Sequence, residues 1–435
     1  MSLKEKIVST YRSFEEAISD SSIITDIKNQ AIEVFEEKGF PTTKDEDWKY
    51  TNLKSLVNVD YCVVPTENED LELADIEEYF VDVNSYKIVV VDGFYNKNLS
   101  DVETTKFIAS SMQKAITLNS ELVLSHLGKI APSDESMVAL NTISHAGGFF
   151  INIPNNAILD KPIQVLHIAT GISGDTLVQP RNIIIVGKNN DVKIIERYQS
   201  LTDNNILTNS VTEISVGENT HYYHYKIQND NANASLIDNT FVAQDRYSNA
   251  YVDTFSFGGN ITRNNLAFAL NEENAVANLN GISLLNEKQH VDNFTFVDHK
   301  VPNCDSHELY KGIYDDSSRG VFTGKILIRK DAQKTNGNQQ NNNLVLSEKA
   351  QISTKPQLEI YADDVKANHG CTIGQIDEEA LFFMRSRGIG KKEAKALLMY
   401  AFASEALKNV KIKELEILIN KLISNKLGVD LEFGE

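Results

Sequence analysis

The stretch GKILIRKDAQKTNGNQQNNNLVLSEKAQISTKPQLEIYADDVKANHGCTIG, Gly324–Gly374, carries the pattern that decides the fold. Its segments GKILIR and PQLEIYA alternate apolar and polar residues, so each predicts a β-strand with one buried and one wetted face. On this alternation Ile326 shares a face with Ile328, and Leu358 shares a face with Ile360. The stretch therefore predicts β-structure with one-sided burial.

The spacing of such runs suggests a solenoid. Runs around Tyr310, Ile326, Val345 and Ile360 recur at roughly 15 to 20 residues, close to what one solenoid turn requires. Asparagine is dense in TNGNQQNNN, residues 335–343, and asparagine tolerates the left-handed backbone of solenoid corners and can stack in ladders. A flexible polar loop is an equal alternative for that segment. A parallel β-helix fits the whole pattern, and a β-sandwich is the alternative.

Short β-rich runs separated by turn residues extend back to about Gly147, and helical patterns flank this region on both sides. Apolar residues at helical spacing end at Gly39, and a second helical region follows Asp377, a candidate N-cap. The chain thus divides into a mainly helical N-terminal domain (1–145), a parallel β-helix core (146–375) and a C-terminal helical domain (376–435). Trp48, the one tryptophan, is expected to anchor a loop on the core.

Composition narrows the class of protein. A net charge of −19 argues against a nucleic-acid-binding surface, and three separated cysteines without a CxxC pair argue against a disulfide framework. No apolar run approaches the roughly 18 residues of a membrane span, and the start lacks the apolar core of a signal peptide. We expect a cytoplasmic protein that binds neither nucleic acid nor membrane.

Standard catalytic motifs are missing, among them GxxxxGK[ST], GxSxG, HExxH and GxGxxG. A β-helix carbohydrate-active enzyme, a polysaccharide lyase or hydrolase, would need acidic and basic groups gathered on one face, and Asp363, Asp364 and Lys366 are the local candidates. His221 and His224 stand three residues apart in a strand pattern, so they should face opposite sides and form no metal pair.

His369 and Cys371 are the strongest candidate ligands. One residue, Gly370, separates them, so on an extended strand both side chains point the same way. Imidazole and thiolate suit iron, zinc or copper, but two ligands are too few for a closed site, and the rest would come from elsewhere. A turn histidine and a buried cysteine are an equal alternative on the residues alone.

Several motifs after Ser306 resemble the SufB/SufD family of iron-sulfur cluster assembly proteins. GVFTGKI, AQKTNGNQQNNNLVLS, KPQLEIYADDVKANHG and LFFMRSRGI occur in the family's order and spacing, and DEDWKYTNLKSL is similar to a motif near the start of the SufD branch. HGCTIG stands where the SufB branch typically has HEATTS. The chain therefore looks like the SufD branch.

This resemblance implies a right-handed parallel β-helix between helical domains, in a scaffold subunit without catalytic activity that pairs with SufB and the ATPase SufC. SufC would dock on about Asp377–Leu427, and the last β-helix strands would pair with SufB. His369 matches the histidine implicated in building the nascent iron-sulfur cluster at that interface. No cofactor is expected in the isolated chain, and an exposed strand edge predicts a homodimer through the end of the β-helix.

The resemblance also has one departure. Many relatives have a cysteine two positions before the histidine, where this chain has Ala367. Cys371 is the nearby thiol, a candidate ligand that we expect to be a buried small apolar residue instead.

Overall fold

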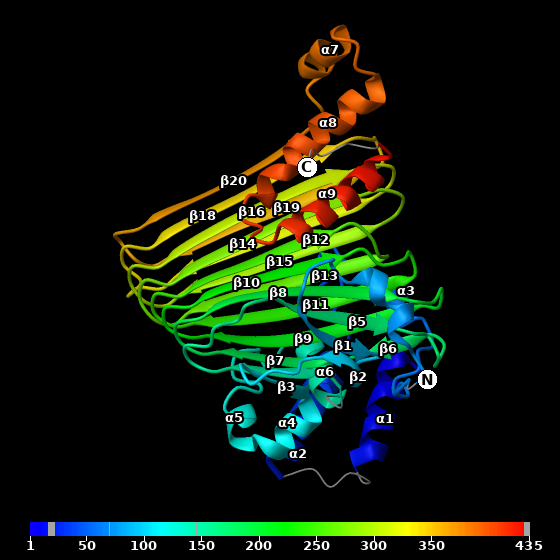
Figure 1. The fold of residues 1–435 in the computed structure, drawn as a ribbon, viewed down its shortest axis with the longest axis vertical. Helices are drawn as coiled ribbons and strands as arrows, with labels where there is room; N and C mark the ends of the chain where they lie inside the picture. Colours follow the sequence, from blue (N-terminus) through cyan, green and yellow to red (C-terminus); the bar gives the residue numbers. More distant parts are fainter. Residues whose placement is uncertain (16–21, 69, 145–146, 430–435) are drawn as a thin grey trace.

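A computed structural model describes residues 1–15, 22–68, 70–144 and 147–429 of the chain. Within these residues two long sheets face each other and form a parallel β-helix (Figure 1). The first sheet contains, in spatial order, β2 (Phe94–Asp101), β1 (Tyr86–Val91), β5 (Ile163–Ala169), β8 (Asp191–Ser200), β10 (His221–Gln228), β12 (Asn249–Ser256), β14 (Val276–Leu285), β16 (Asp305–Tyr314), β18 (Asn336–Val345) and β20 (Lys366–Gly374). Among these described strands, only β1 and β2 pair antiparallel.

The second sheet faces the first across the interior. It contains, in spatial order, β3 (Ile108–Ser111), β4 (Phe149–Ile153), β7 (Arg181–Val186), β9 (Ile206–Val216), β11 (Ala234–Gln244), β13 (Ile261–Leu270), β15 (His290–His299), β17 (Arg319–Ile328) and β19 (Gln351–Ile360), and β6 (Thr176–Val178) pairs with β9 beside this path. Successive strands after β7 pair in parallel within their own sheet, which excludes the β-sandwich alternative.

One turn of the β-helix holds two strands, one in each sheet. Asp305 of β16 aligns with Asn336 of β18, which aligns with Lys366 of β20, so each step between these residues is one full turn. The prediction that the spacing of the apolar runs marks one turn is wrong. That spacing is half a turn, because consecutive strands lie in opposite sheets.

Asparagine plays the predicted part at the corners. Asn156, Asn189 and Asn219 have left-handed φ values of 59°, 58° and 55°. Their side chains form a ladder, with Nδ2 of Asn189 donating to Asn156 at 2.8 Å and Nδ2 of Asn219 donating to Asn189 at 2.9 Å. The segment 335–343 itself is neither a corner nor a flexible loop, since most of it is strand β18.

Inward-facing apolar side chains fill the core of the first turns, and alternation along the strands explains which residues they are. Ile326 and Ile328 are fully buried, as their shared face predicts. Leu358 is half-buried and Ile360 is 42% exposed, because β19 is the last strand of its sheet and has a neighbour on one side only.

Helices cover both flanks of the solenoid. They are α1 (Leu3–Glu15), α2 (Ser22–Lys38), α3 (Lys54–Val57), α4 (Met112–Leu118), α5 (Ser120–Leu124), α6 (Ser136–Ser144), α7 (Glu378–Ser386), α8 (Lys391–Ser404) and α9 (Lys413–Leu427), with short 3₁₀ turns at Glu46–Trp48, Leu73–Asp75, Glu77–Tyr79 and Glu405–Leu407. No helix in the described ranges is long and apolar enough to cross a bilayer.

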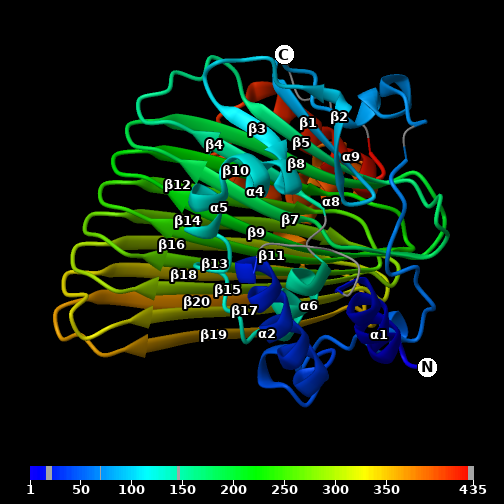
Figure 2. The ribbon, with the colours of Figure 1, turned by 90° about the horizontal axis from the view of Figure 1, so that it is seen from below.

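The N-terminal helices pack near the first turns. Figure 2 shows α2 and α6 beside the second sheet, and their apolar side chains form one cluster with Leu207 and Ile237 of that sheet. Residues 1–145 also contribute β1, β2 and β3 to the two sheets, so the N-terminal region is partly built into the solenoid. The predicted boundary between 145 and 146 falls outside the described residues.

Helices α8 and α9 lie on the outer face of the first sheet, whereas α7 stands away from it (Figure 1). Asp377 caps α7 as predicted, with its carboxylate accepting from the backbone of Glu379 and Ala380. Lys426 of α9 donates to the backbone oxygen of Phe257 at 2.7 Å, and Lys311 of β16 forms an ion pair with Glu405. Apolar contacts and these polar links fix α8 and α9 to the solenoid.

Candidate functional site

His369 and Cys371 lie on β20, the final strand of the first sheet, as the sequence analysis predicted for a shared strand. They align with Gln339 and Asn341 of β18, which are both buried in the interior, while the intervening Gln340 is exposed. Both candidate ligands therefore occupy interior-facing positions of the last turn. Because no strand pairs with the free side of β20 in the described structure, both residues are exposed.

The expectation that Cys371 is buried is therefore wrong. Its thiol is exposed, whereas Cys304 is buried and Cys62 is intermediate. The position faces inward, but burial would need one more strand above β20, and the described sheet ends there. The predicted thiol ligand is thus accessible at the open end of the β-helix.

Polar side chains continue beneath these two residues into the interior. Glu308 of β16 aligns with Gln339, and its Oε2 accepts hydrogen bonds from Thr295 at 2.7 Å and from Gln339 at 3.2 Å. Asn343 donates to Asn341 at 2.7 Å on the same strand. The interior beneath His369 and Cys371 is therefore polar, whereas Ile326 and Ile328 of β17 form an apolar cluster in another part of the same end.

Glu308 is buried without a basic partner among the groups that shift its pKa. Burial raises the pKa of its carboxyl from 4.5 to about 7, and the hydrogen bonds from Thr295 and Gln339 oppose the rise only in part. Ionised Glu308 is therefore disfavoured in the folded protein.

Replacing Glu308 with Gln is expected to change how stability depends on pH. In the wild type the unfolded carboxyl ionises near pH 4.5 and the folded one near 7, so stability is lost as the pH rises across this window. The difference corresponds to about 3 kcal/mol as an upper limit. Between pH 4.5 and pH 8, the free energy of unfolding measured in urea should fall in the wild type by up to this amount more than in E308Q. An equal change in the two proteins would contradict the prediction.

A second polar cluster lies deeper in the interior, and the sequence analysis missed it. Glu196 accepts from His167 and His224, each at 2.9 Å, and lies 3.5 Å from the Lys226 ammonium. Lys226 also pairs with Asp238 at 2.5 Å. Burial favours neutral Glu196, but Lys226 and the two histidines outweigh it and hold the pKa of Glu196 well below its ordinary value.

The pattern that could have revealed this cluster is the alternation in HYYHYKIQ, residues 221–228. His221 is exposed and His224 is buried, so the prediction that they face opposite sides is confirmed. The same alternation places Lys226 on the same face of the strand as His224, and both side chains are buried. Among the described residues, no group of three or more His, Cys, Asp or Glu side chains is arranged to hold a metal ion.

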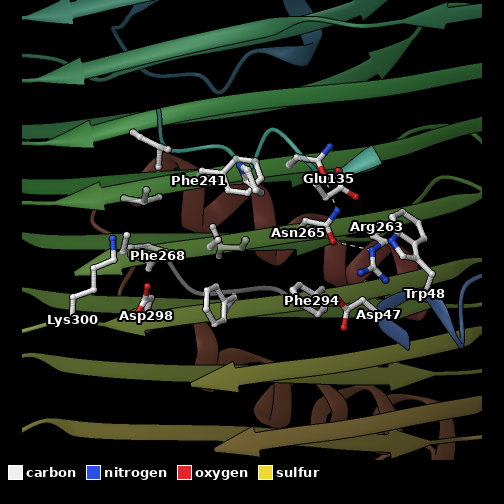
Figure 3. Close-up of a pocket in the computed structure, with 18 residues that line it drawn as sticks. Asp47, Trp48, Glu135, Phe241, Arg263, Asn265, Phe268, Phe294, Asp298 and Lys300 are labelled. Atoms are coloured by element: carbon white, nitrogen blue, oxygen red, sulfur yellow. Dashed lines mark hydrogen bonds between the residues drawn. The ribbon is translucent and has the colours of Figure 1, made fainter. Parts of the chain in front are cut away.

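A cavity near the N-terminal region lies on the outer face of the second sheet. Figure 3 shows this cavity of about 310 Å³, with Trp48 and Arg263 at one end and Lys300 at the other. The Arg263 guanidinium is 4.0 Å from the Trp48 ring centre and 5.3 Å from that of Phe294, and it forms an ion pair with Asp292. Trp48 is buried, so its predicted anchoring role is confirmed.

The residues named as candidates for a carbohydrate-active enzyme do not lie at that cavity. Asp363, Asp364 and Lys366 are exposed at the turn into β20, and none of them lines it. The Asp364 carboxylate forms an ion pair with Lys334 of the neighbouring turn. Asp364 therefore links successive corners of the solenoid.

Comparison with known proteins agrees with this architecture. Residues 1–165 match the family model described as the SufBD protein N-terminal region, and residues 167–402 match the SufBD core domain of the SUF system for iron-sulfur cluster assembly. The chain is similar to an iron-sulfur cluster assembly SufBD family protein of Synechocystis sp., with 30% identity over 93% of this chain and 92% of the relative.

Two further relatives represent the two branches. Iron-sulfur cluster assembly protein SufD of Escherichia coli is 31% identical, covering 84% of each chain. Iron-sulfur cluster assembly protein SufB of Bacillus subtilis is 26% identical, covering 76% of this chain and 70% of the relative. The chain belongs to the SufBD family and is an iron-sulfur cluster assembly protein.

Proposed function

We propose that the chain is a SufD-type scaffold subunit in the cytoplasm, which pairs through β20 with a SufB-type chain to build a nascent iron-sulfur cluster. One observation carries the proposal: the terminal strand presents His369 and Cys371 at interior-facing positions with no strand covering them among the described residues. A partner strand added to this edge would enclose both side chains between two β-helices.

The cluster is cargo in this proposal, and the chain supplies part of its surroundings. Neutral imidazole from His369 binds iron, while partner thiolates and, as a weaker candidate, Cys371 hold sulfur or iron. Two ligands from one chain are too few for a cluster, so the remaining ligands come from the partner. The isolated chain is expected to carry no cluster.

The proposed partner at the C-terminal helices is a SufC-type ATPase, which supplies the ATP hydrolysis that this non-catalytic scaffold lacks. Phe382 and Phe383 of α7 are 73% and 57% exposed, and α7 stands away from the solenoid in Figure 1. Exposed aromatic side chains of this size favour a protein contact.

The open edge itself can be tested by charge. Ile373 of β20 is 55% exposed, and Ile373→Lys is expected to weaken pairing with the SufB-type chain, and the homodimer of the isolated protein, at least ~10-fold. The partner strand would bury the charge of a lysine at this position, and taking a charge out of water is costly. Co-purification with the partners and light scattering of the isolated chain measure the two effects.

The matched control is Ile172→Lys, because Ile172 is 59% exposed in the turn between β5 and β6, away from the strand edge and from the C-terminal helices. It should leave both associations unchanged. A wild-type chain that is strictly monomeric at micromolar concentration would contradict the homodimer, and an Ile373→Lys chain that still binds its SufB-type partner normally would contradict pairing through β20.

A further inference from the structure

Three side chains of the first sheet occupy one interior-facing column at the open end. Strands β16, β18 and β20 lie side by side at this end (Figure 1). Glu308 of β16 aligns with Gln339 of β18, and Gln339 aligns with His369 of β20. Gln339 is fully buried and Glu308 is 3% exposed. Neighbouring strands lie about 4.8 Å apart, so Gln339 is the side chain between the buried carboxyl and the exposed imidazole.

The amide of Gln339 is held in one orientation from two sides. Its Nε2 donates to Oε2 of Glu308 at 3.2 Å, and that oxygen also accepts from Thr295. The amide lies in space left by Gly324 of β17, where an added Cβ would stand 2.2 Å from Nε2. Because the amide nitrogen of Gln339 donates to Glu308, the amide oxygen is the atom that can accept a hydrogen bond from another group.

That oxygen has no donor within the described structure. Oε1 of Gln339 is buried and makes no hydrogen bond there. A buried carbonyl oxygen left unpaired costs about 1–3 kcal/mol, so the site favours a donor at this position. The next residue along the column is His369, and a neutral imidazole offers one N–H donor and one lone pair.

We propose that Gln339 is a positioning residue whose Oε1 accepts the ring N–H of His369, which leaves the other ring nitrogen free to bind metal at the open end. This inference rests on the proposed function for its purpose, because fixing one tautomer presents the lone pair to an incoming iron ion. Ligand histidines in metal sites are commonly held in this way by a second hydrogen bond. Glu308 and Gly324 act indirectly, because the first binds the Gln339 amide and the second leaves space for it.

The test is the tautomer of His369 in the full-length isolated chain at a pH where the ring is neutral. Histidine labelled with ¹⁵N reports the tautomer by NMR, and the His369→Ala spectrum assigns the signal. The wild type is expected to show one dominant tautomer, and Gln339→Leu is expected to lose it and give a mixture. Gln340→Leu, on the exposed face of the same strand, is the matched control and should keep the wild-type pattern.

A second variant reaches the same amide without changing it. Gly324→Ala should displace the Gln339 amide and also give mixed tautomers, so the inference remains testable if Gln339→Leu does not fold. The inference would be overturned if the wild type and Gln339→Leu gave the same mixture of His369 tautomers. If only Gly324→Ala folds, the same comparison is made between the wild type and Gly324→Ala. The measurement uses no cluster and no partner. A fixed tautomer together with unchanged cluster assembly in His369→Ala would therefore reject the ligand role of His369 in the proposed function and leave this inference standing.

Discussion

Lys226→Met is expected to lower the free energy of unfolding by about 3–5 kcal/mol, the largest loss of stability that we predict for a single substitution. The Lys226 ammonium is buried and bonds Asp238 at 2.5 Å and the Thr240 hydroxyl at 2.6 Å. It also lies 3.5 Å from the Glu196 carboxylate. Without this cation, two carboxylates would share a low-dielectric interior.

His224, one of the two histidines beside Glu196, cannot replace the lost charge at neutral pH. Burial lowers the pKa of His224, despite the nearby Glu196 carboxylate, so its imidazole is neutral there. It can donate a hydrogen bond to Glu196 but adds no positive charge. The remaining carboxylates would have to take up protons, and the loss of stability should therefore be greater at pH 8 than at pH 5.

Chemical unfolding of the full chain, followed by circular dichroism, measures this effect. Lys188→Met is the matched control, because the Lys188–Glu218 pair has side chains 53% and 34% exposed. Such a surface pair contributes roughly 0–1 kcal/mol. Adding Asp238→Asn to Lys226→Met should recover part of the loss by removing one carboxylate. Equal effects of the Lys226 and Lys188 substitutions would show that the buried cation contributes little.

The buried cluster also shows where sequence analysis stops. Lysine and glutamate are seldom fully buried, so composition places them on the surface unless partners are known. The partners of Lys226 come from other strands, Asp238 from β11 of the facing sheet and Glu196 from β8 of the preceding turn. Alternation along one strand predicts the face that Lys226 occupies, but only the pairing of strands brings the charges together.

Helices and strands, in contrast, could be predicted from the sequence, because their signals are local. Alternation identified the strands around Ile326 and Leu358, and a side-chain cap at Asp377 marked the start of α7, because each depends on neighbours in sequence. The length of a turn was misjudged because spacing alone does not say whether the next strand joins the same sheet. Burial of Cys371 was misjudged because it depends on a strand that the described sheet does not have above β20.

His369→Ala is expected to have the largest effect on cluster assembly. Co-expressed with the proposed SufB-type and SufC-type partners, the variant should retain the complex but lose iron and sulfide at least ~10-fold, the lower range for a disturbed metal site. His369 is exposed on the edge strand, and in the described structure its backbone pairs with β18 but its side chain makes no hydrogen bond on which folding would depend. Its removal should therefore spare stability, and the cluster content of the purified complex reports the change.

Two controls separate a ligand from a structural contact. His221→Ala removes an exposed histidine from β10 of the same sheet, far from the edge, and should leave the cluster unchanged. Cys371→Ser tests the second candidate, and a loss as large as that of His369→Ala would make both side chains part of the assembly site. Unchanged iron and sulfide in an intact His369→Ala complex would reject the ligand role, because a scaffold that contributes only shape needs the β20 edge but not its imidazole.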